Sequence, residues 1–340
     1  MKRIVECVPN FSEGRDKEVV NRIVTAIREA EAGGLRVQVL HVDAGEAANR
    51  TVVTFMGEAE AVCEAAFQGV RTAADLIDMR QQHGTHPRIG ATDVLPLVPI
   101  CGITLEECAV LARKLAERIY KELGIPCYCY EAAAFRPERR NLAVCRAGEY
   151  ESLPEKMEDP LRRPDFGPPH YDERTARTGA TVVGARDILI AVNFNLEAPS
   201  KGTDCKGEVL LAQEIACDVR EKGRKVNGEW VRGTLKGCKA IGWYIEEYGI
   251  AQVSMNITDI HATPLHKAYE EVCRAAAARG TRITGTEIIG LVPRSVLEEA
   301  GRYFLRQQAC KSTGQSFIQA AIKAMHLDDL CPFDVEKKTF

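Results

Sequence analysis

The spacing of apolar residues predicts a regular order of strands and helices in the first half of the chain. Val19, Val20, Ile23, Val24 and Ile27 recur at the period of an amphipathic helix. Shorter apolar or alternating runs around this helix are typical of strands. The expected elements are strand 3–8, helix 16–31 (ended by Gly33 and Gly34), strands 37–42 and 49–56, helix 59–79, strand 94–100, helix 105–123 and strand 127–130. This is the βαββαβ order of a ferredoxin-like unit, extended by one helix and one strand.

The second half repeats the same order with little sequence identity to the first. The expected elements are strand 187–192, helix 204–221, strands 238–244 and 251–257, helix 264–279 and strand 282–291, followed by short helices. The fold class is therefore α/β (α+β), with two ferredoxin-like βαββαβ subdomains, mixed sheets and helices on the outer faces. We expect the two halves to face each other across a cleft. The expected domains are 1–180, 181–305 and a C-terminal helical tail, 306–340.

Residues 151–178 show neither the helix nor the strand period. They contain five prolines among charged residues. A run of this length without secondary structure is usually a linker or a functional loop. Phe166 and Tyr171 in this run either pack on a flat heterocyclic ligand or anchor the linker.

Composition and charge restrict the classes of partner. The 340 residues are 45% hydrophobic and 27% charged, as in globular proteins with a packed core. The net charge of −3 gives no general attraction to nucleic acid or to an anionic membrane. No apolar run approaches the ~20 residues needed to span a bilayer, and no signal peptide precedes the first strand, so we expect a cytoplasmic protein. Thirteen cysteines, an odd number, favour reduced thiols within the core.

The strongest candidate for chemistry is the polar stretch 82–93, which lies between a predicted helix and a predicted strand. Pro87 restricts the preceding residue to an extended conformation, so His86 is presented in a defined way. An imidazole titrates near neutral pH and can act as a general acid and base. Two alternatives stay open. His86 either hydrogen-bonds only its own loop, or forms a metal pair with His83, although no nearby Cys or His completes a usual zinc site.

Arginines are concentrated in a second polar stretch. Arg136, Arg139, Arg140 and Arg146 fall within eleven residues that Pro and Gly interrupt. The planar guanidinium fork suits carboxylates and phosphates, which favours an anion site. A solvated surface cluster paired with neighbouring glutamates is the alternative, and the sequence does not decide between them.

Several stretches together resemble the glutamate formiminotransferase family. The similar stretches, in the order of the family, are 5–14 (VECVPNFSEG), 42–45 (VDAG), 49–52 (NRTV), 84–93 (GTHPRIGATD), 146–151 (RAGEYE), 164–168 (PDFGP) and 242–244 (GWY). The resemblance implies transfer of the formimino group from N-formimino-L-glutamate to N5 of tetrahydrofolate, as in histidine degradation. Tetrahydrofolate would be a co-substrate and no metal is expected.

The resemblance also implies roles for individual residues. His86 would be the catalytic base, Asp43 would orient His86 or the formimino nitrogen, and Asn10 would line the same pocket. Arg139 and Arg140 would hold substrate carboxylates. The folate-binding residues would be Gly167, Pro168, Pro169, His170, Tyr171 and Gly179, within a loop that carries a charged insert at 172–177.

The resemblance suggests partners and leaves two alternative functions. Family members commonly form homodimers and act on polyglutamylated folate. Fused members continue into a cyclodeaminase domain, so a separate cyclodeaminase would be a partner here. One alternative is a formyltransferase reaction with 5-formyltetrahydrofolate and glutamate. The other is a folate-binding protein without turnover.

Overall fold

The chain folds into two compact units, residues 1–187 and 188–340. The computed structural model describes residues 2–46, 48–84, 86–197, 205–307 and 316–340. Thr85 and Asp204, which belong to two of the predicted segments, lie outside the described residues. The predicted domain boundary after residue 180 falls just before a strand, 181–185, that belongs to the first unit.

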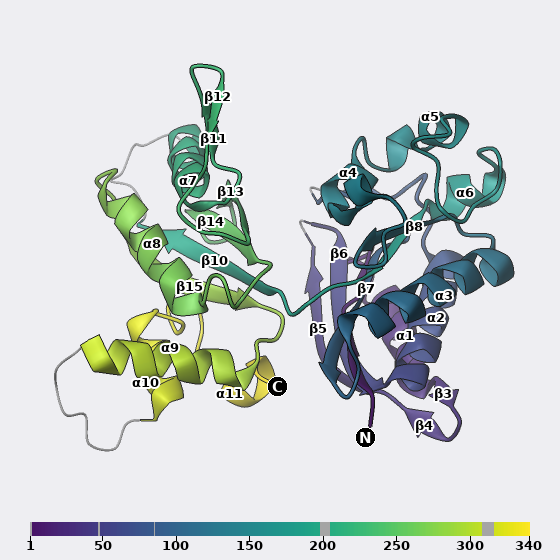
Figure 1. Cartoon of the computed structure of the whole chain (residues 1–340), viewed down its shortest axis with the longest axis horizontal. Helices are drawn as coiled ribbons and strands as arrows, with labels where there is room; N and C mark the ends of the chain where they lie inside the picture. The colour runs from purple at the N-terminus through teal and green to yellow at the C-terminus, as the bar shows by residue number, and fades with distance from the viewer. Residues whose placement is uncertain (1, 47, 85, 198–204, 308–315) are drawn as a thin grey trace. The chain divides into compact units, whose positions relative to one another are not determined.

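The first unit is built on a mixed sheet with three long helices (Figure 1). Its strands are β1 (Ile4–Cys7), β2 (Asn10–Phe11), β5 (Gln38–Gly45), β6 (Arg50–Glu58), β7 (Thr92–Cys101), β8 (Cys127–Glu131) and β9 (Thr181–Ala185). Its long helices are α1 (Lys17–Glu29), α2 (Ala59–Leu76) and α3 (Leu105–Leu123). The order β7–β1/β2–β6–β5 is that of a ferredoxin-like sheet, and β9 and β8 extend it with parallel pairing.

Helix α1 shows how the sequence sets these elements. The Asp16 carboxylate accepts hydrogen bonds from the main-chain N–H groups of Glu18 and Val19 and so caps the helix. Val20, Ile23, Val24 and Ile27 are buried, as their spacing predicts. They pack with apolar residues of α2, α3 and the sheet in one core cluster.

The second unit repeats the ferredoxin-like topology. Its strands are β10 (Ile190–Leu196), β13 (Cys238–Ile245), β14 (Ile250–Ile257) and β15 (Ile283–Ile289), in the order β13–β14–β10–β15. Helices α7 (Cys205–Val219) and α8 (Leu265–Ala277) pack on the sheet, and α9 (Arg294–Gln307), α10 (Phe317–Ala324) and α11 (Val335–Lys338) complete the unit. The predicted duplication is thus confirmed in strand order. The cleft between the halves stays a prediction.

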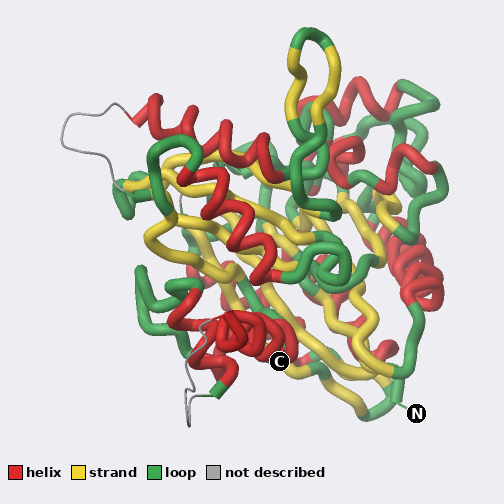
Figure 2. The backbone as a smooth tube through the Cα atoms, turned by 60° about the vertical axis from the view of Figure 1, so that its left-hand side comes forward, coloured by secondary structure: helices red, strands yellow, loops and turns green. Residues whose placement is uncertain are grey.

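Several local predictions are wrong. Gly33 and Gly34 do not end a helix but form the turn between β3 (Glu31–Ala32) and β4 (Leu35–Arg36). Residues 151–178, expected to lack secondary structure, contain α5 (Leu153–Glu158) and α6 (Glu173–Thr178). Further short elements are η1 (Pro137–Arg140), α4 (Leu142–Arg146) and η2 (Tyr150–Ser152). The hairpin β11 (Arg224–Val226) and β12 (Glu229–Val231), which projects from the second unit in Figures 1 and 2, was not predicted.

Candidate functional site

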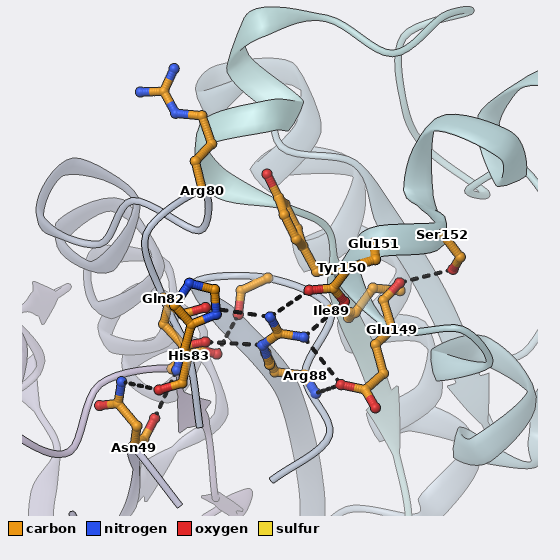
Figure 3. A network of polar contacts seen from close by, with 12 residues as sticks. Asn49, Arg80, Gln82, His83, Arg88, Ile89, Glu149, Tyr150, Glu151 and Ser152 are labelled. Atoms are coloured by element: carbon orange, nitrogen blue, oxygen red, sulfur yellow. Dashed lines mark hydrogen bonds and ion pairs between the residues drawn. The ribbon is translucent and has the colours of Figure 1, made fainter. Parts of the chain in front are cut away.

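Asn49, at the turn between β5 and β6, joins three segments of the first unit. Its side-chain Oδ1 accepts a hydrogen bond from the Gly14 N–H at 3.0 Å, and its Nδ2 donates to the His83 carbonyl at 2.8 Å. Its main-chain carbonyl accepts from Gln82 Nε2 at 3.0 Å (Figure 3). Asn49 adopts a left-handed φ of 48°, which asparagine tolerates better than most residues. Asn49 therefore holds together residue 14, the turn between β5 and β6, and the polar stretch 82–93.

Arg88 fixes the other side of the 82–93 stretch. Its guanidinium contacts both oxygens of Glu151, at 2.9 and 2.7 Å, and Glu149 Oε2 at 3.1 Å (Figure 3). Its Nε donates to Gln82 Oε1 at 3.0 Å. The Arg88 side chain is buried, and the hydrogen bond with Glu151 lowers the pKa of that carboxyl group. Arg88 is therefore a structural tie between the 82–93 stretch and residues 149–151.

Glu149 has a main-chain conformation that is otherwise almost restricted to glycine. Its φ is 55° and its ψ is −158°. Such a conformation costs about 1–3 kcal/mol and persists only where the surroundings impose it. The bonds from Arg88 to the Glu149 carboxylate supply part of that constraint.

Gly90 lies where two backbone segments approach closely. Its carbonyl accepts a hydrogen bond from Ser12 Oγ at 2.7 Å, and it forms an isolated bridge with Gly179. A Cβ at Gly90 would lie 2.2 Å from the Ala180 carbonyl oxygen and 2.8 Å from the Ala180 nitrogen. Only glycine fits this position without moving the backbone.

We therefore expect Gly90→Ala to lower the free energy of unfolding of the first unit by about 1–3 kcal/mol, as overpacking does. Urea denaturation of the purified variant measures this change. Gly207→Ala is the matched control because a Cβ there has no atom within 4 Å and the residue lies in helix α7, so stability should stay equal or rise slightly. Equal urea midpoints for Gly90→Ala and the wild type would contradict the close approach.

His86 lies between its own loop and the start of β6. Its Nδ1 is 2.7 Å from the Pro87 carbonyl oxygen, which can only accept, so Nδ1 carries the proton. In the neutral ring Nε2 is then the basic nitrogen, and it accepts a hydrogen bond from Arg50 Nη1. Burial, followed by the charges of Arg50 and Arg146, lowers the pKa of His86 to about 3, against a smaller opposing effect of the Pro87 carbonyl. His86 is therefore neutral at physiological pH.

Two arginines, Arg50 and Arg146, act on this histidine, and two aspartates, Asp43 and Asp93, act on Arg50. Arg146 Nη2, from α4, lies 2.7 Å from Oδ2 of Asp93, on β7. Asp93 is only 1% exposed, and its Oδ1 accepts from the Ile89 N–H at 3.0 Å. Arg50 interacts electrostatically with Asp93, Arg146 and Asp43, and burial lowers its pKa to about 10.

The two arginines keep donors that the protein does not use. Within the part of the chain that the structure describes, Arg50 Nε and Arg146 Nε are buried and have no hydrogen-bond partner. A buried polar group without a partner costs about 1–3 kcal/mol, and more when it is charged. Unused donors on two neighbouring cations therefore indicate a site for an anionic group such as a carboxylate.

Asn10 and Asp43 lie close to this cluster, in one row across the sheet. Val52 on β6 pairs with Asn10 on one side and with Asp43 on the other. Such cross-strand partners point to the same face of a sheet. Asn10 is buried and donates to the Val8 carbonyl at 2.8 Å, whereas Asp43 interacts with Arg50, which itself contacts His86.

The arginines of the second polar stretch do not gather at one site. Arg139 is buried and forms an ion pair with Asp165 at 2.5 Å, and its Nη2 donates to the Arg163 carbonyl at 2.6 Å. Arg140 is exposed. Arg136 donates to the carbonyl of Leu161 at 2.9 Å. Only Arg146 reaches the His86 cluster, so the structure gives Arg139 a structural contact rather than a free guanidinium.

Five of the residues predicted to bind folate are consecutive, 167–171, and the sixth, Gly179, follows helix α6. Gly167 packs against Pro126 and Pro164. The preceding residue, Phe166, forms an isolated bridge with Cys127 of β8. Pro168, Pro169 and His170 follow it, and His170 is exposed, 3.2 Å from Glu158. Tyr171 packs near Tyr150. Gly179 forms an isolated bridge with Gly90 and so directly contacts the 82–93 stretch.

Sequence reasoning missed the role of Arg50 and Asp93, although both lie inside stretches that resemble the family. Asp43, Arg50, His86, Asp93 and Arg146 come from four separate quoted stretches, and the fold brings them together. The signal that could have found them is that three of these stretches lie in or directly before strands of one sheet, β5, β6 and β7.

Comparisons with known proteins identify the family of the chain. Residues 4–186 match the family described as "Formiminotransferase domain, N-terminal subdomain", and residues 202–340 match "Formiminotransferase domain". The chain belongs to the formiminotransferase domain family. The boundary between the two family descriptions lies close to the division into two units at residue 187.

Relatives of two lengths are similar to this formiminotransferase-family chain. A formimidoyltransferase-cyclodeaminase of Gallus gallus is 44% identical over 99% of the chain, which spans only 59% of that relative. A glutamate formimidoyltransferase of Streptococcus pyogenes is 40% identical over 90% of the chain and 94% of the relative. One of Thermoplasma acidophilum is 39% identical over 89% of the chain and 92% of the relative.

The described residues contain neither a membrane-spanning helix nor a cluster of metal ligands. None of the described helices combines the length and apolar character needed to cross a bilayer. The same residues contain no group of three or more His, Cys, Asp and Glu side chains placed to hold a metal ion.

Proposed function

We propose that this chain transfers the formimino group from N-formimino-L-glutamate to N5 of tetrahydrofolate. The observation that carries the proposal is the cluster around His86, a neutral base beside two cationic side chains with unused donors. The names of the two relatives that the chain covers almost fully, both glutamate formimidoyltransferases, support the same reaction.

His86 would move the proton that the reaction requires. The N5 lone pair attacks the formimino carbon and forms the new N–C bond, and N5 gives its proton to Nε2 of His86. The C–N bond to glutamate then breaks, and the protonated imidazole returns the proton to the departing glutamate nitrogen. No net proton is gained or lost, as general acid and base catalysis by one group requires. The products are 5-formiminotetrahydrofolate and L-glutamate.

Arg50 and Arg146 are better placed than Arg139 and Arg140 to bind a substrate carboxylate. Both have a buried Nε donor without a partner beside His86, even though Arg146 also pairs with Asp93. Arg139 pairs with Asp165 and Arg140 is exposed, and neither has a contact with the His86 cluster among the described residues. We retain Asn10 and Asp43 as neighbours of the reacting groups. Gly167, Pro168, Pro169, His170, Tyr171 and Gly179 stay proposed folate-binding residues, on the resemblance alone.

The proposal extends to the cellular setting. It includes a homodimer in the cytoplasm that acts on polyglutamylated folate. The resemblance to the family supports these points.

The test is a transfer assay with purified protein, N-formimino-L-glutamate and tetrahydrofolate. We expect one L-glutamate to be released for each 5-formiminotetrahydrofolate formed, and no release without tetrahydrofolate. Absence of glutamate release, with turnover of 5-formyltetrahydrofolate and glutamate instead, would replace the proposal by the formyltransferase reaction. Bound tetrahydrofolate without turnover of either donor would indicate a folate-binding protein.

A further inference from the structure

We infer that Arg50 caps the basic nitrogen of His86 in the free protein, and that a substrate carboxylate releases this nitrogen by taking over the Arg50 guanidinium. The inference rests on the proposed function, because it assumes that His86 acts as a base. It assigns to Arg50 a positioning role that links carboxylate binding to the activation of His86.

In the free protein, neither ring nitrogen of His86 is available to accept a proton, because both take part in hydrogen bonds. The Pro87 carbonyl engages Nδ1, so Nε2 is the only nitrogen with an available lone pair. Arg50 Nη1 donates a hydrogen bond to that same Nε2. A lone pair that accepts a hydrogen bond from a guanidinium cannot accept a proton from substrate at the same time. Arg50 must therefore leave Nε2 before His86 can act.

A carboxylate is the ligand that can displace this contact. Arginine binds a carboxylate through two parallel N–H···O bonds, and such charge-assisted bonds are about twice as strong as bonds between neutral groups. The contact with His86 offers Arg50 only one neutral acceptor. Arg50 Nε and Arg146 Nε are both buried, and neither has a hydrogen-bond partner among the described residues. An entering carboxylate would satisfy these donors.

The charges around His86 favour the same exchange. Arg50 on β6 and Arg146 on α4 both act on His86, while Asp93 on β7 and Asp43 on β5 act on Arg50. In the free protein the two guanidinium charges oppose protonation of His86. A carboxylate bound to Arg50 compensates one of these charges. Burial remains the largest cause of the lowered pKa of His86, so the bound carboxylate raises this pKa above about 3 and brings it nearer to the range in which a general base is effective.

This arrangement makes the carboxylate of the donor a requirement for catalysis and not only for binding. A donor that carries the reacting group without a carboxylate, such as formamidine, would leave Arg50 on His86. Binding energy from a part of the substrate remote from the reacting carbon would thus be used to raise kcat.

The test follows the titration of His86 by NMR with ¹⁵N-labelled histidine, and the His86 signals are assigned with His86→Gln. In the wild type we expect neutral His86, protonated on Nδ1, with no titration between about pH 5 and 8. In Arg50→Met, and in the wild type with saturating L-glutamate, the midpoint of the His86 titration should lie at higher pH than in the free wild type. The matched control Arg22→Met, an exposed arginine on α1, should behave like the wild type.

Two outcomes would overturn the inference. One is an unchanged titration of His86 in Arg50→Met. The other is an unchanged titration of His86 in the wild type with saturating L-glutamate, compared with the wild type in sodium chloride at the same ionic strength. If Arg50→Met does not fold, the comparison of the wild type with and without L-glutamate decides alone.

The readout also separates this inference from the proposed function. A glutamate-dependent titration of His86 without any formimino transfer would support the cap and contradict the proposed reaction. Transfer activity with an unchanged His86 titration would support the reaction and contradict the cap. A comparison of donors adds a kinetic criterion, since kcat for formamidine should fall well below kcat for formiminoglutamate in the wild type.

Discussion

Replacing His86 with glutamine is expected to lower kcat for the proposed transfer by about 10²- to 10⁴-fold, the contribution that a positioned general acid and base usually makes. Glutamine is polar and of similar length, but it cannot accept and return a proton near neutral pH. Binding of tetrahydrofolate should change little, since the Arg88 and Asn49 contacts that shape the loop do not involve the His86 side chain. Steady-state kinetics and a direct binding measurement of tetrahydrofolate separate the two effects.

His83→Gln is the matched control for this variant. His83 lies three residues earlier in the same stretch, is exposed, and contributes its main-chain carbonyl to the contact with Asn49. Its side chain should therefore be dispensable for transfer. Full activity of His86→Gln would remove the base from the proposed mechanism. An equal loss in both variants would revive the metal pair, which a chelator would then test directly.

The elements that periodicity could predict are those whose burial follows a simple repeat. Helices α1, α2 and α3 and both βαββαβ orders were recognised because one face of each element is apolar and packs on a core. Strand β9 was missed because it has only five residues, begins two residues after Gly179 and contains Gly184, so the local pattern resembles a loop. Its strand character comes from parallel pairing with β7 and β8, which are distant in sequence.

The candidate site was predictable where residue type alone restricts the chemistry, as at His86. It was not predictable where the decisive fact is which partner a side chain reaches. Arg139 and Arg146 look equivalent in the sequence, yet one is paired with Asp165 and the other with Asp93 beside His86. A high local density of arginine predicts nearby anionic groups. Here the anionic partners of Arg139 and Arg146 are carboxylates of the protein itself, Asp165 and Asp93.

Arg88→Met is expected to reduce both stability and activity, because Arg88 ties the 82–93 stretch to residues 149–151. Glu149 and Glu151 have side chains 42% and 61% exposed and can turn to water, but Gln82 is 6% exposed and would keep an unpaired amide oxygen. A buried polar group without its partner costs about 1–3 kcal/mol, so we expect a loss of about 2 kcal/mol in urea denaturation at pH 7. A shift of about 1 Å in the loop that carries His86 can lower the transfer rate by about 10²-fold.

The pH dependence of this loss distinguishes an ion pair from packing alone. Arg88 lowers the pKa of Glu151 below its ordinary value of 4.5, so the pair stabilises the folded state above that value. Its contribution is lost as the pH falls through the lowered pKa, and the difference between Arg88→Met and the wild type should narrow on the acidic side.

Arg88→Lys should recover little, since an ammonium cannot meet both Glu151 oxygens and Gln82 at once. Glu151→Gln should cost much less than Arg88→Met, because its side chain is mostly exposed and surface pairs contribute little. If Glu151→Gln were as damaging as Arg88→Met, the stability of the loop would depend on the Glu151 charge and not on the satisfaction of Gln82. Wild-type stability and activity in Arg88→Met would show that Asn49 alone holds the catalytic loop in place.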